Sequence, residues 1–177
     1  GFAKSGTKAA TLDVNTNLNL NINYLILNLD LSYYSPEDTI FLDFSYMHHG
    51  EEEHDNDSVW IRGNNAAPWV GLYDLFANRA SAGTYRNVNA LYISTALVNA
   101  GQAFSATFQI RFGQEDNFPA TSTTISDGFT FDDIHLYYPS VIFSENFESF
   151  SVPSTLQNGW VNATGDDMDW SVNAGPT

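Results

Sequence analysis

The sequence contains no cysteine, so disulfides and thiolate chemistry are both excluded. Only 6 Lys and Arg residues stand against 21 Asp and Glu, which gives a net charge of -15 at pH 7. So few cations cannot form the basic patch that supplies most nucleic-acid affinity, and we expect neither nucleic acid nor an anionic membrane as a partner. A continuous apolar run of roughly 18 residues is also absent, so we expect no insertion into a membrane.

The composition that remains is that of a folded, acidic domain. Hydrophobic residues make up 43% and aromatic residues 15%, which is more than a disordered chain carries. A chain of this length buries roughly 70% of its unfolded surface and can support its own core. Carboxylates in such excess repel one another, and either bound cations or a high-salt medium relieves the repulsion, so we expect calcium or life in salt water. The chain begins with neither Met nor a signal peptide, and we expect a piece of a longer precursor.

Short runs of β-branched and aromatic residues, separated by Gly, Asn, Asp, Ser and Pro, indicate strands throughout the chain. In residues 18–31 the apolar alternation changes phase after Tyr24, which predicts a bulge, a bend or a change of sheet there. At most one helical turn is expected, at residues 75–84. This pattern predicts an all-β fold of two antiparallel sheets packed as a sandwich. The predicted strands cover residues 9–14, 18–31, 39–47, 58–62, 69–74, 89–97, 104–112, 129–138 and 141–143.

A boundary is predicted near Pro139, after the last long strand. Residues 1–138 hold most of the predicted strands and form the main part of the sandwich. Residues 139–177 are too short for a core of their own. We therefore expect them to pack back on the same sandwich or on a neighbouring subunit.

Acidic side chains gather in three segments near predicted strand ends, DGFTFDDI at 127–134, ENFES at 145–149 and GDDMDW at 165–170. Calcium takes six to eight oxygen ligands, many of them carboxylates, and three such segments could converge on one ion. The alternative is that each segment is a solvated turn or takes part in salt bridges. For each segment alone this alternative is favoured, but the chain has too few cations to pair with all the carboxylates, so both interpretations stay open for the segments taken together.

A fourth polar segment, HHGEEEHDND at 48–57, contains three histidines and five carboxylates. A zinc protease needs a His-Glu pair and a second His on one helix face, whereas here Gly50 separates His49 from Glu51 and the segment lies between two predicted strands. The segment is therefore interpreted as a solvated acidic loop.

Catalytic motifs do not emerge from the sequence, and we expect no enzyme. The sequence has no Gly-x-Ser-x-Gly elbow, and its acidic pairs are too frequent to identify a glycosidase. Aromatic side chains offer a binding function instead, because sugar rings stack on exposed ring faces. Trp69, after Pro68, and Tyr73 are the candidate ligand-binding residues, whereas Trp60 and Trp170 are expected in the core.

The C-terminal stretch ENFES…GWVNATGDDMDWSVNAGPT, residues 145–177, resembles the opening of a MAM domain, and FDDI at 131–134 resembles the end of that module. The two ends occur in reversed order. The region from DSVWIRGNN to FTFDDI is similar to modules of long Bacteroidota surface proteins. The resemblance implies a jelly-roll sandwich related to concanavalin-like lectins, an adhesive function and a metal ion near the meeting point of the chain ends. The implied ligands are Glu148, Asp166 or Asp167, and Asp132 or Asp133.

The sequence therefore predicts a non-catalytic extracellular module, secreted or on the cell surface. The first hypothesis is an adhesion or structural module of a large surface or filament protein, which contacts protein partners or copies of itself and contains a structural calcium. The alternative is a carbohydrate-binding module of a secreted hydrolase, with glycans as partners and Trp69 and Tyr73 as the platform.

Overall fold

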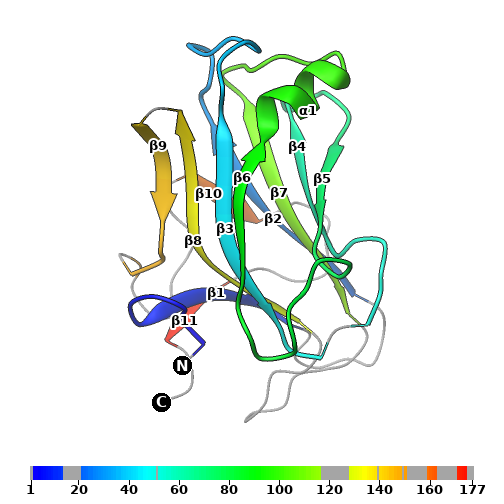
Figure 1. Cartoon of the computed structure of the whole chain (residues 1–177), viewed down its shortest axis with the longest axis vertical. Coiled ribbons are helices and arrows are strands. Elements are labelled where there is room, and N and C mark those ends of the chain that lie inside the picture. Colours follow the sequence, from blue (N-terminus) through cyan, green and yellow to red (C-terminus); the bar gives the residue numbers. More distant parts are fainter. Residues whose placement is uncertain are drawn as a thin grey trace.

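The computed structural model describes residues 2–13, 21–50, 52–116, 128–138, 140–148, 150, 159–162 and 171–174. These residues form two antiparallel sheets that pack against each other, with one short helix (Figure 1). The predicted all-β, two-sheet sandwich is confirmed.

The first sheet has six strands, and its hydrogen-bonded order is β11 (Ser171–Ala174), β1 (Lys8–Leu12), β8 (Phe129–Tyr138), β3 (Phe41–His48) and β6 (Arg86–Tyr92), with β9 (Ser140–Glu145) also paired to β8. The second sheet has five, in the order β10 (Trp160–Asn162), β2 (Asn21–Leu29), β7 (Phe108–Asp116), β4 (Ser58–Arg62) and β5 (Val70–Asp74). The helix α1 spans Ile93–Asn99 and lies at one end of the sandwich (Figure 1).

Aromatic rings from both sheets fill the core. Phe44 of β3 and Phe131 of β8 meet Phe112 of β7 across the interior, with ring centroids 5.5 Å apart for Phe44–Phe112 and 5.1 Å for Phe112–Phe131. All three residues are at most 1% exposed. Burial of a side chain of this size contributes roughly 1.5–3 kcal/mol, so each of these rings stabilises the packing of one sheet on the other.

The pairing of strand β2 tests two of the three alternatives that were predicted from its change of phase, a bulge and a change of sheet. The strand pairs with β7 without a register shift from Asn21 opposite Asp116 to Leu29 opposite Phe108, so neither a bulge nor a change of sheet occurs. Asn23 faces the interior together with Leu25 and is fully buried. Apolar residues cover both faces of this strand, which is why their alternation misled the prediction.

The segment predicted as a strand at 89–97 divides into the end of β6 and the helix α1. Ile93 and Leu97, four residues apart, are both fully buried, as expected for the inner face of a helix. The expected helical turn at 75–84 is instead a series of turns and bends.

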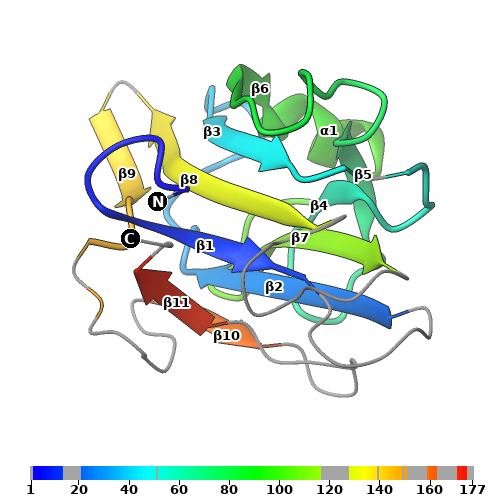
Figure 2. The ribbon, with the colours of Figure 1, turned by 90° about the horizontal axis from the view of Figure 1, so that it is seen from below.

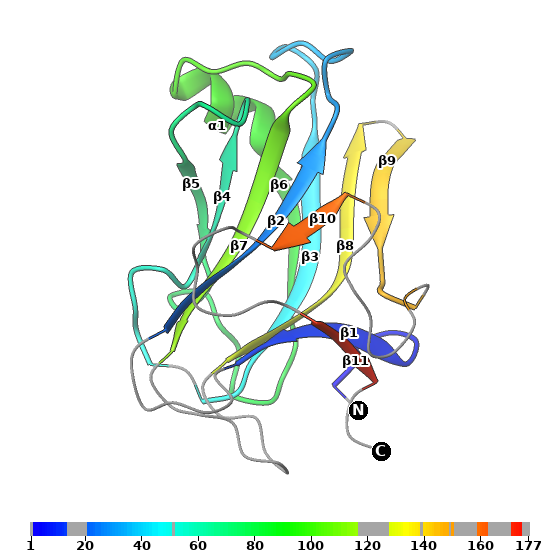
Figure 3. The ribbon, with the colours of Figure 1, turned by 180° about the vertical axis from the view of Figure 1, so that it is seen from behind.

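The C-terminal segment adds strands to both sheets of the same chain. β9 pairs with β8, β10 pairs with β2 and β11 pairs with β1 (Figure 3). β1 and β9 share one edge of β8, since β1 pairs with Phe129–Phe131 and β9 with Ile134–Tyr138. Asp132 and Asp133 therefore lie where one neighbour of β8 gives way to the other, and they accept hydrogen bonds from the N-terminal segment. Figure 2 shows this segment, in blue, beside β8 and β9.

Candidate functional site

Two β-bulges flank the same point of β3. The pairing of β3 with β6 shifts register between Leu42 and Phe44, and its pairing with β8 shifts between Asp43 and Ser45. Ala90 of β6 and Asp133 of β8 have left-handed backbone angles, with φ of 55° and 50°. Such angles cost a non-glycine residue of order 1–3 kcal/mol and cluster at functional sites, as bulges do.

A pocket of about 340 Å³ lies at these bulges, on the outer side of the six-stranded sheet. This volume is at the lower end of the range for small-molecule sites. The pocket is mainly polar. Its lining includes hydrogen-bond donors and acceptors, and both positively and negatively charged side chains. It is lined by Lys4, Asp43, Phe44, Ser45, Asn89, Asp133 and His135.

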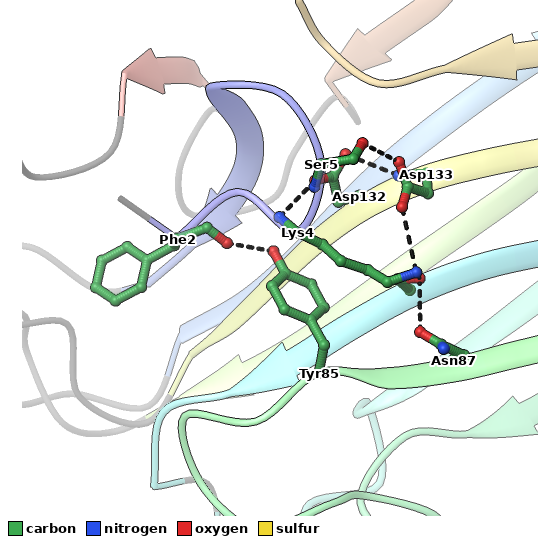
Figure 4. Close-up of polar contacts among 8 residues, drawn as sticks. Phe2, Lys4, Ser5, Tyr85, Asn87, Asp132 and Asp133 are labelled. Atoms are coloured by element: carbon green, nitrogen blue, oxygen red, sulfur yellow. Dashed lines mark hydrogen bonds and ion pairs between the residues drawn. The ribbon is translucent and has the colours of Figure 1, made fainter.

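The N-terminal segment forms one wall of the pocket. The Lys4 ammonium donates to Ser45 Oγ at 2.8 Å and lies 3.2 Å from Asp133 Oδ2, while Ser45 donates to Asn87 at 3.2 Å (Figure 4). The hydroxyl of Tyr85 holds the same segment through the carbonyl of Phe2 at 2.5 Å. Lys4 is thus fixed in place rather than free in solvent.

Asp43 of β3 also lines the pocket. Its Oδ1 accepts the amide of Ala90 at 2.6 Å and the hydroxyl of Tyr137 at 3.3 Å. The bulge at Ala90 thereby orients the carboxylate of Asp43. Asp43 was not among the residues predicted from the sequence, although a charged residue inside the apolar run of β3 indicates a site.

A row of three aromatic residues adjoins the pocket. Phe41 lies in register with Tyr92 on one side and Tyr137 on the other, with ring centroids 5.3 and 5.5 Å apart. Tyr92 is 41% exposed. Phe41 is two positions before Asp43 on β3, so the rings and the polar pocket occupy one continuous face.

Asp132, a predicted metal ligand, is fully buried beneath the N-terminal segment. Its Oδ2 accepts the amides of Lys4 at 2.8 Å and Ser5 at 3.1 Å, and its Oδ1 accepts the amide of Asp133 at 2.8 Å. Burial raises the pKa of the Asp132 carboxyl above its ordinary value, and these hydrogen bonds offset only part of that rise. Asp133, also predicted as a ligand, accepts the hydroxyl of Ser5 at 2.5 Å in addition to contacting Lys4.

Glu148, the third described member of the predicted ligand set, binds the next part of the same segment. It accepts the amide of Thr7 at 2.6 Å, the hydroxyl of Thr7 at 2.7 Å and the amide of Lys8. These hydrogen bonds, with that of the Thr7 hydroxyl first, lower the pKa of Glu148. We call residues 4–8, together with the carboxylates that hold them, the N-terminal clamp.

The structure thus brings Asp132, Asp133 and Glu148 to one segment, but amides, hydroxyls and lysines contact their oxygens. Within the described part of the chain, no group of three or more His, Asp or Glu side chains is placed to hold a metal ion. Asp166 and Asp167 lie outside the described residues, so a calcium ion that involves them stays a prediction.

The opposite outer face, on the five-stranded sheet, contains the predicted ligand-binding residue Trp69. Arg62 lies over its ring, with Cζ 4.2 Å from the ring centroid. Tyr73, the other predicted platform residue, packs its ring against the core instead, 5.7 Å from Phe44 and 6.0 Å from Tyr46. Of the two, only Trp69 lies on that outer face.

Trp60 was expected in the core, but it lies on this outer face. Val59 and Ile61 are fully buried, so the alternation along β4 turns Trp60 and Arg62 outward. Trp60 and Arg62 are two positions apart on one strand, so their side chains lie on the same face, and the charged Arg62 indicated that this face is the outer one.

The histidine-rich segment 48–57 forms no common site in its described residues. His48 contacts the carbonyl of Ala80 at 3.0 Å, whereas His49 contacts Thr130 at 2.7 Å. The expectation of a solvated loop is wrong for Asp57, which is 1% exposed and accepts the amide of Glu115 at 2.9 Å. Burial raises the pKa of Asp57 to about 7.

Comparison of the chain with protein-family models, curated proteins and solved structures finds no significant match. The described residues contain no helix that is long and apolar enough to span a membrane.

Proposed function

We propose that the chain is a non-catalytic glycan-binding module that holds a neutral sugar residue in the pocket at the two bulges. The observation that carries this proposal is a polar pocket of about 340 Å³ directly beside the ring row of Tyr92, Phe41 and Tyr137. Apolar ring faces and a few fixed polar groups are the combination that sugar recognition requires.

The pocket residues match the hydroxyl groups of a sugar, each of which donates and accepts. Asp43 supplies an acceptor, Asn89 supplies both a donor and an acceptor, and His135 supplies a ring nitrogen. The ion pair between Lys4 and Asp133 cancels two of the charges in the pocket. A neutral ligand therefore fits better than a strongly charged one.

The same contacts favour binding over hydrolysis. A glycosidase needs one carboxylic acid in surroundings that keep it protonated and a second carboxylate across the scissile bond. Asp133 contacts Lys4, and Asp43 accepts an amide and a phenol, so neither carboxyl stands alone in apolar surroundings as the acid of a glycosidase does.

Calorimetric titration with a panel of neutral oligosaccharides tests the proposal. Tyr92→Ala and Asn89→Ala should each weaken binding about tenfold, since a ring stack or a well-placed hydrogen bond contributes about 1–1.5 kcal/mol. Tyr33→Ala and Asn65→Ala are the matched controls, because Tyr33 is 92% exposed and both residues lie outside the pocket. Absence of binding to every neutral glycan, or equal losses in the controls, would refute the proposal.

An extracellular adhesion role is a compatible second proposal, with glycans rather than copies of the chain as the contacted partner. The pairing of β10 with β2 and β11 with β1 supports this preference, because the two sheets are completed without a strand from a neighbour. Size-exclusion chromatography with light scattering should give a monomer. Concentration-dependent growth into fibres would instead favour strand exchange between subunits.

A further inference from the structure

Three aromatic rings surround one guanidinium on the outer face of the five-stranded sheet. The Cζ atom of Arg111 lies 4.1 Å from the ring centroid of Trp60, 4.2 Å from that of Tyr24 and 4.5 Å from that of Trp69. Arg62 stands beside this group, over the ring of Trp69. We call these five residues the arginine box.

The register of the sheet builds the arginine box. Trp60 of β4 lies directly opposite Arg111 of β7, and Tyr24 of β2 lies opposite Gly113, two positions further along β7. Gly113 leaves room for the Trp60 ring, since a Cβ there would lie 2.5 Å from Cζ3 of that ring. The strand glycine thus allows the indole to cover the sheet where a larger residue would displace it.

Arg111 has no anionic partner in the part of the chain that the structure describes, despite the 21 Asp and Glu of the sequence. Its buried Nε has no hydrogen-bond partner there either. Burial lowers the pKa of Arg111, and the charge of Arg62 acts in the same direction. Arg62 donates from Nε to the side chain of Gln109 at 2.5 Å and from Nη1 to the carbonyl of Ala67 at 3.5 Å, and both acceptors are uncharged.

Two neighbouring guanidinium groups that aromatic rings hold, and that no carboxylate of the described residues contacts, form a receptor for an anion. A guanidinium presents its N–H groups as a planar fork that matches a carboxylate, and its position between rings reduces the entropy lost on binding. Indole rings beside that fork offer stacking surface for a sugar.

We infer that the arginine box binds the carboxylate of an acidic sugar, a uronate residue within an oligosaccharide. The site lies on the other sheet from the bulge pocket and takes a ligand of different charge, so it goes beyond the proposed function. The net charge of -15 repels densely charged polyanions at long range, which favours a ligand with few, separated carboxylates.

The test is calorimetric titration of the intact chain with a neutral oligosaccharide that ends in one galacturonate residue and with the methyl ester of that oligosaccharide, at physiological ionic strength. The ester retains the sugar rings and removes the charge, so it is the matched control ligand. The free acid should bind at least about tenfold more tightly, because charge-assisted hydrogen bonds are stronger than hydrogen bonds between neutral groups. Binding of the free acid should also change tryptophan fluorescence, because two of the four Trp residues belong to the arginine box.

Arg111→Gln should abolish the preference for the free acid, and Arg111→Lys should reduce it because the charge remains and the fork is lost. Arg79→Gln is the matched control variant, since Arg79 also lies over an aromatic ring, that of Phe76, at 3.5 Å outside the arginine box. Arg62→Gln provides a second test if Arg111 variants fold poorly by circular dichroism.

Equal affinity for acid and ester, no binding of the acid, or equal loss in Arg79→Gln would overturn the inference. Binding of a sulfated oligosaccharide in place of the carboxylated one would overturn the assignment to uronates. Loss of neutral-glycan binding in the Tyr92 variant leaves this inference untouched, because the two sites lie on different sheets.

Discussion

Substitution of Gly113 by Ala tests how tightly the outer face of the five-stranded sheet is packed. A Cβ at Gly113 would lie 2.5 and 2.9 Å from two ring carbons of Trp60 and 2.7 Å from the carbonyl oxygen of Asn56. Ordinary contacts between such atoms are about 3.5–4.0 Å, so the methyl group overlaps its neighbours by about 1 Å. The carbonyl belongs to the backbone, and the side chain of Asn56 is itself held by Tyr24 at 2.5 Å and Glu115 at 2.7 Å.

Overpacking of this kind costs about 1–3 kcal/mol, and Ala in a strand regains roughly 0.5–1 kcal/mol relative to Gly. The expected result for Gly113→Ala is therefore a net loss of about 1–2 kcal/mol of unfolding free energy. In a domain of this size that corresponds to a fall of roughly 2–8 °C in Tm. Urea denaturation followed by circular dichroism measures it directly.

Gly71 provides the matched control on the other side of the same ring. A Cβ there would lie 4.0 Å from Cδ1 of Trp60, an ordinary van der Waals contact. Gly71→Ala should therefore be neutral or slightly stabilising. If Gly113→Ala and Gly71→Ala change stability by the same amount, the indole does not lie against Gly113 in solution and the packing argument fails.

Three further predictions concern charge. The pKa of Glu148 is lower in the folded protein than in the unfolded chain. Its contribution to stability is therefore complete above the unfolded-state pKa and is lost as the pH falls through the folded-state pKa. Glu148→Gln should flatten the acid limb of a Tm-versus-pH curve. Asp57 has a raised pKa of about 7 against an unfolded value of 3.8, so its contribution is greatest below about pH 4 and declines as the pH rises through 7. Asp57→Asn should remove a decline of a few kcal/mol between those limits, and an unchanged curve would place Asp57 in solvent. For the predicted calcium ion, a chelator should lower Tm in differential scanning calorimetry, and an unchanged Tm would eliminate the ion.

The fold followed from the sequence because strand periodicity and turn residues are local properties. The run from Ile40 to Tyr46 was predicted as a strand and is β3 from Phe41 onward. The short helix was missed, since Ile93 and Leu97 fit a strand pattern as well as a helix face. The phase of β2 was misjudged because Asn23 is buried among apolar neighbours, which only the pairing with β7 reveals.

The candidate sites were less accessible to prediction because they depend on register. Asp43, Asn89 and His135 are separated by more than 40 residues at each step and meet only through the pairing of three strands. The left-handed angles of Ala90 and Asp133 belong to bulges that no local residue pattern announces, since neither is glycine. The carboxylates that the sequence selected do converge, but on a peptide segment whose role was not anticipated.

The N-terminal clamp has a mechanical consequence. Lys8 lies opposite Ala174, so the chain enters β1 and leaves β11 at the same end of an antiparallel pair. A pulling force applied through these two ends would peel β11 from β1 one rung at a time, the weakest way to load a pair of strands. At the start of β1, however, the carboxylates of Asp132 and Glu148 accept hydrogen bonds from four backbone amides, those of Lys8 and of three residues before it. Tension from the N-terminal end therefore loads the N-terminal clamp before it loads the rest of β1.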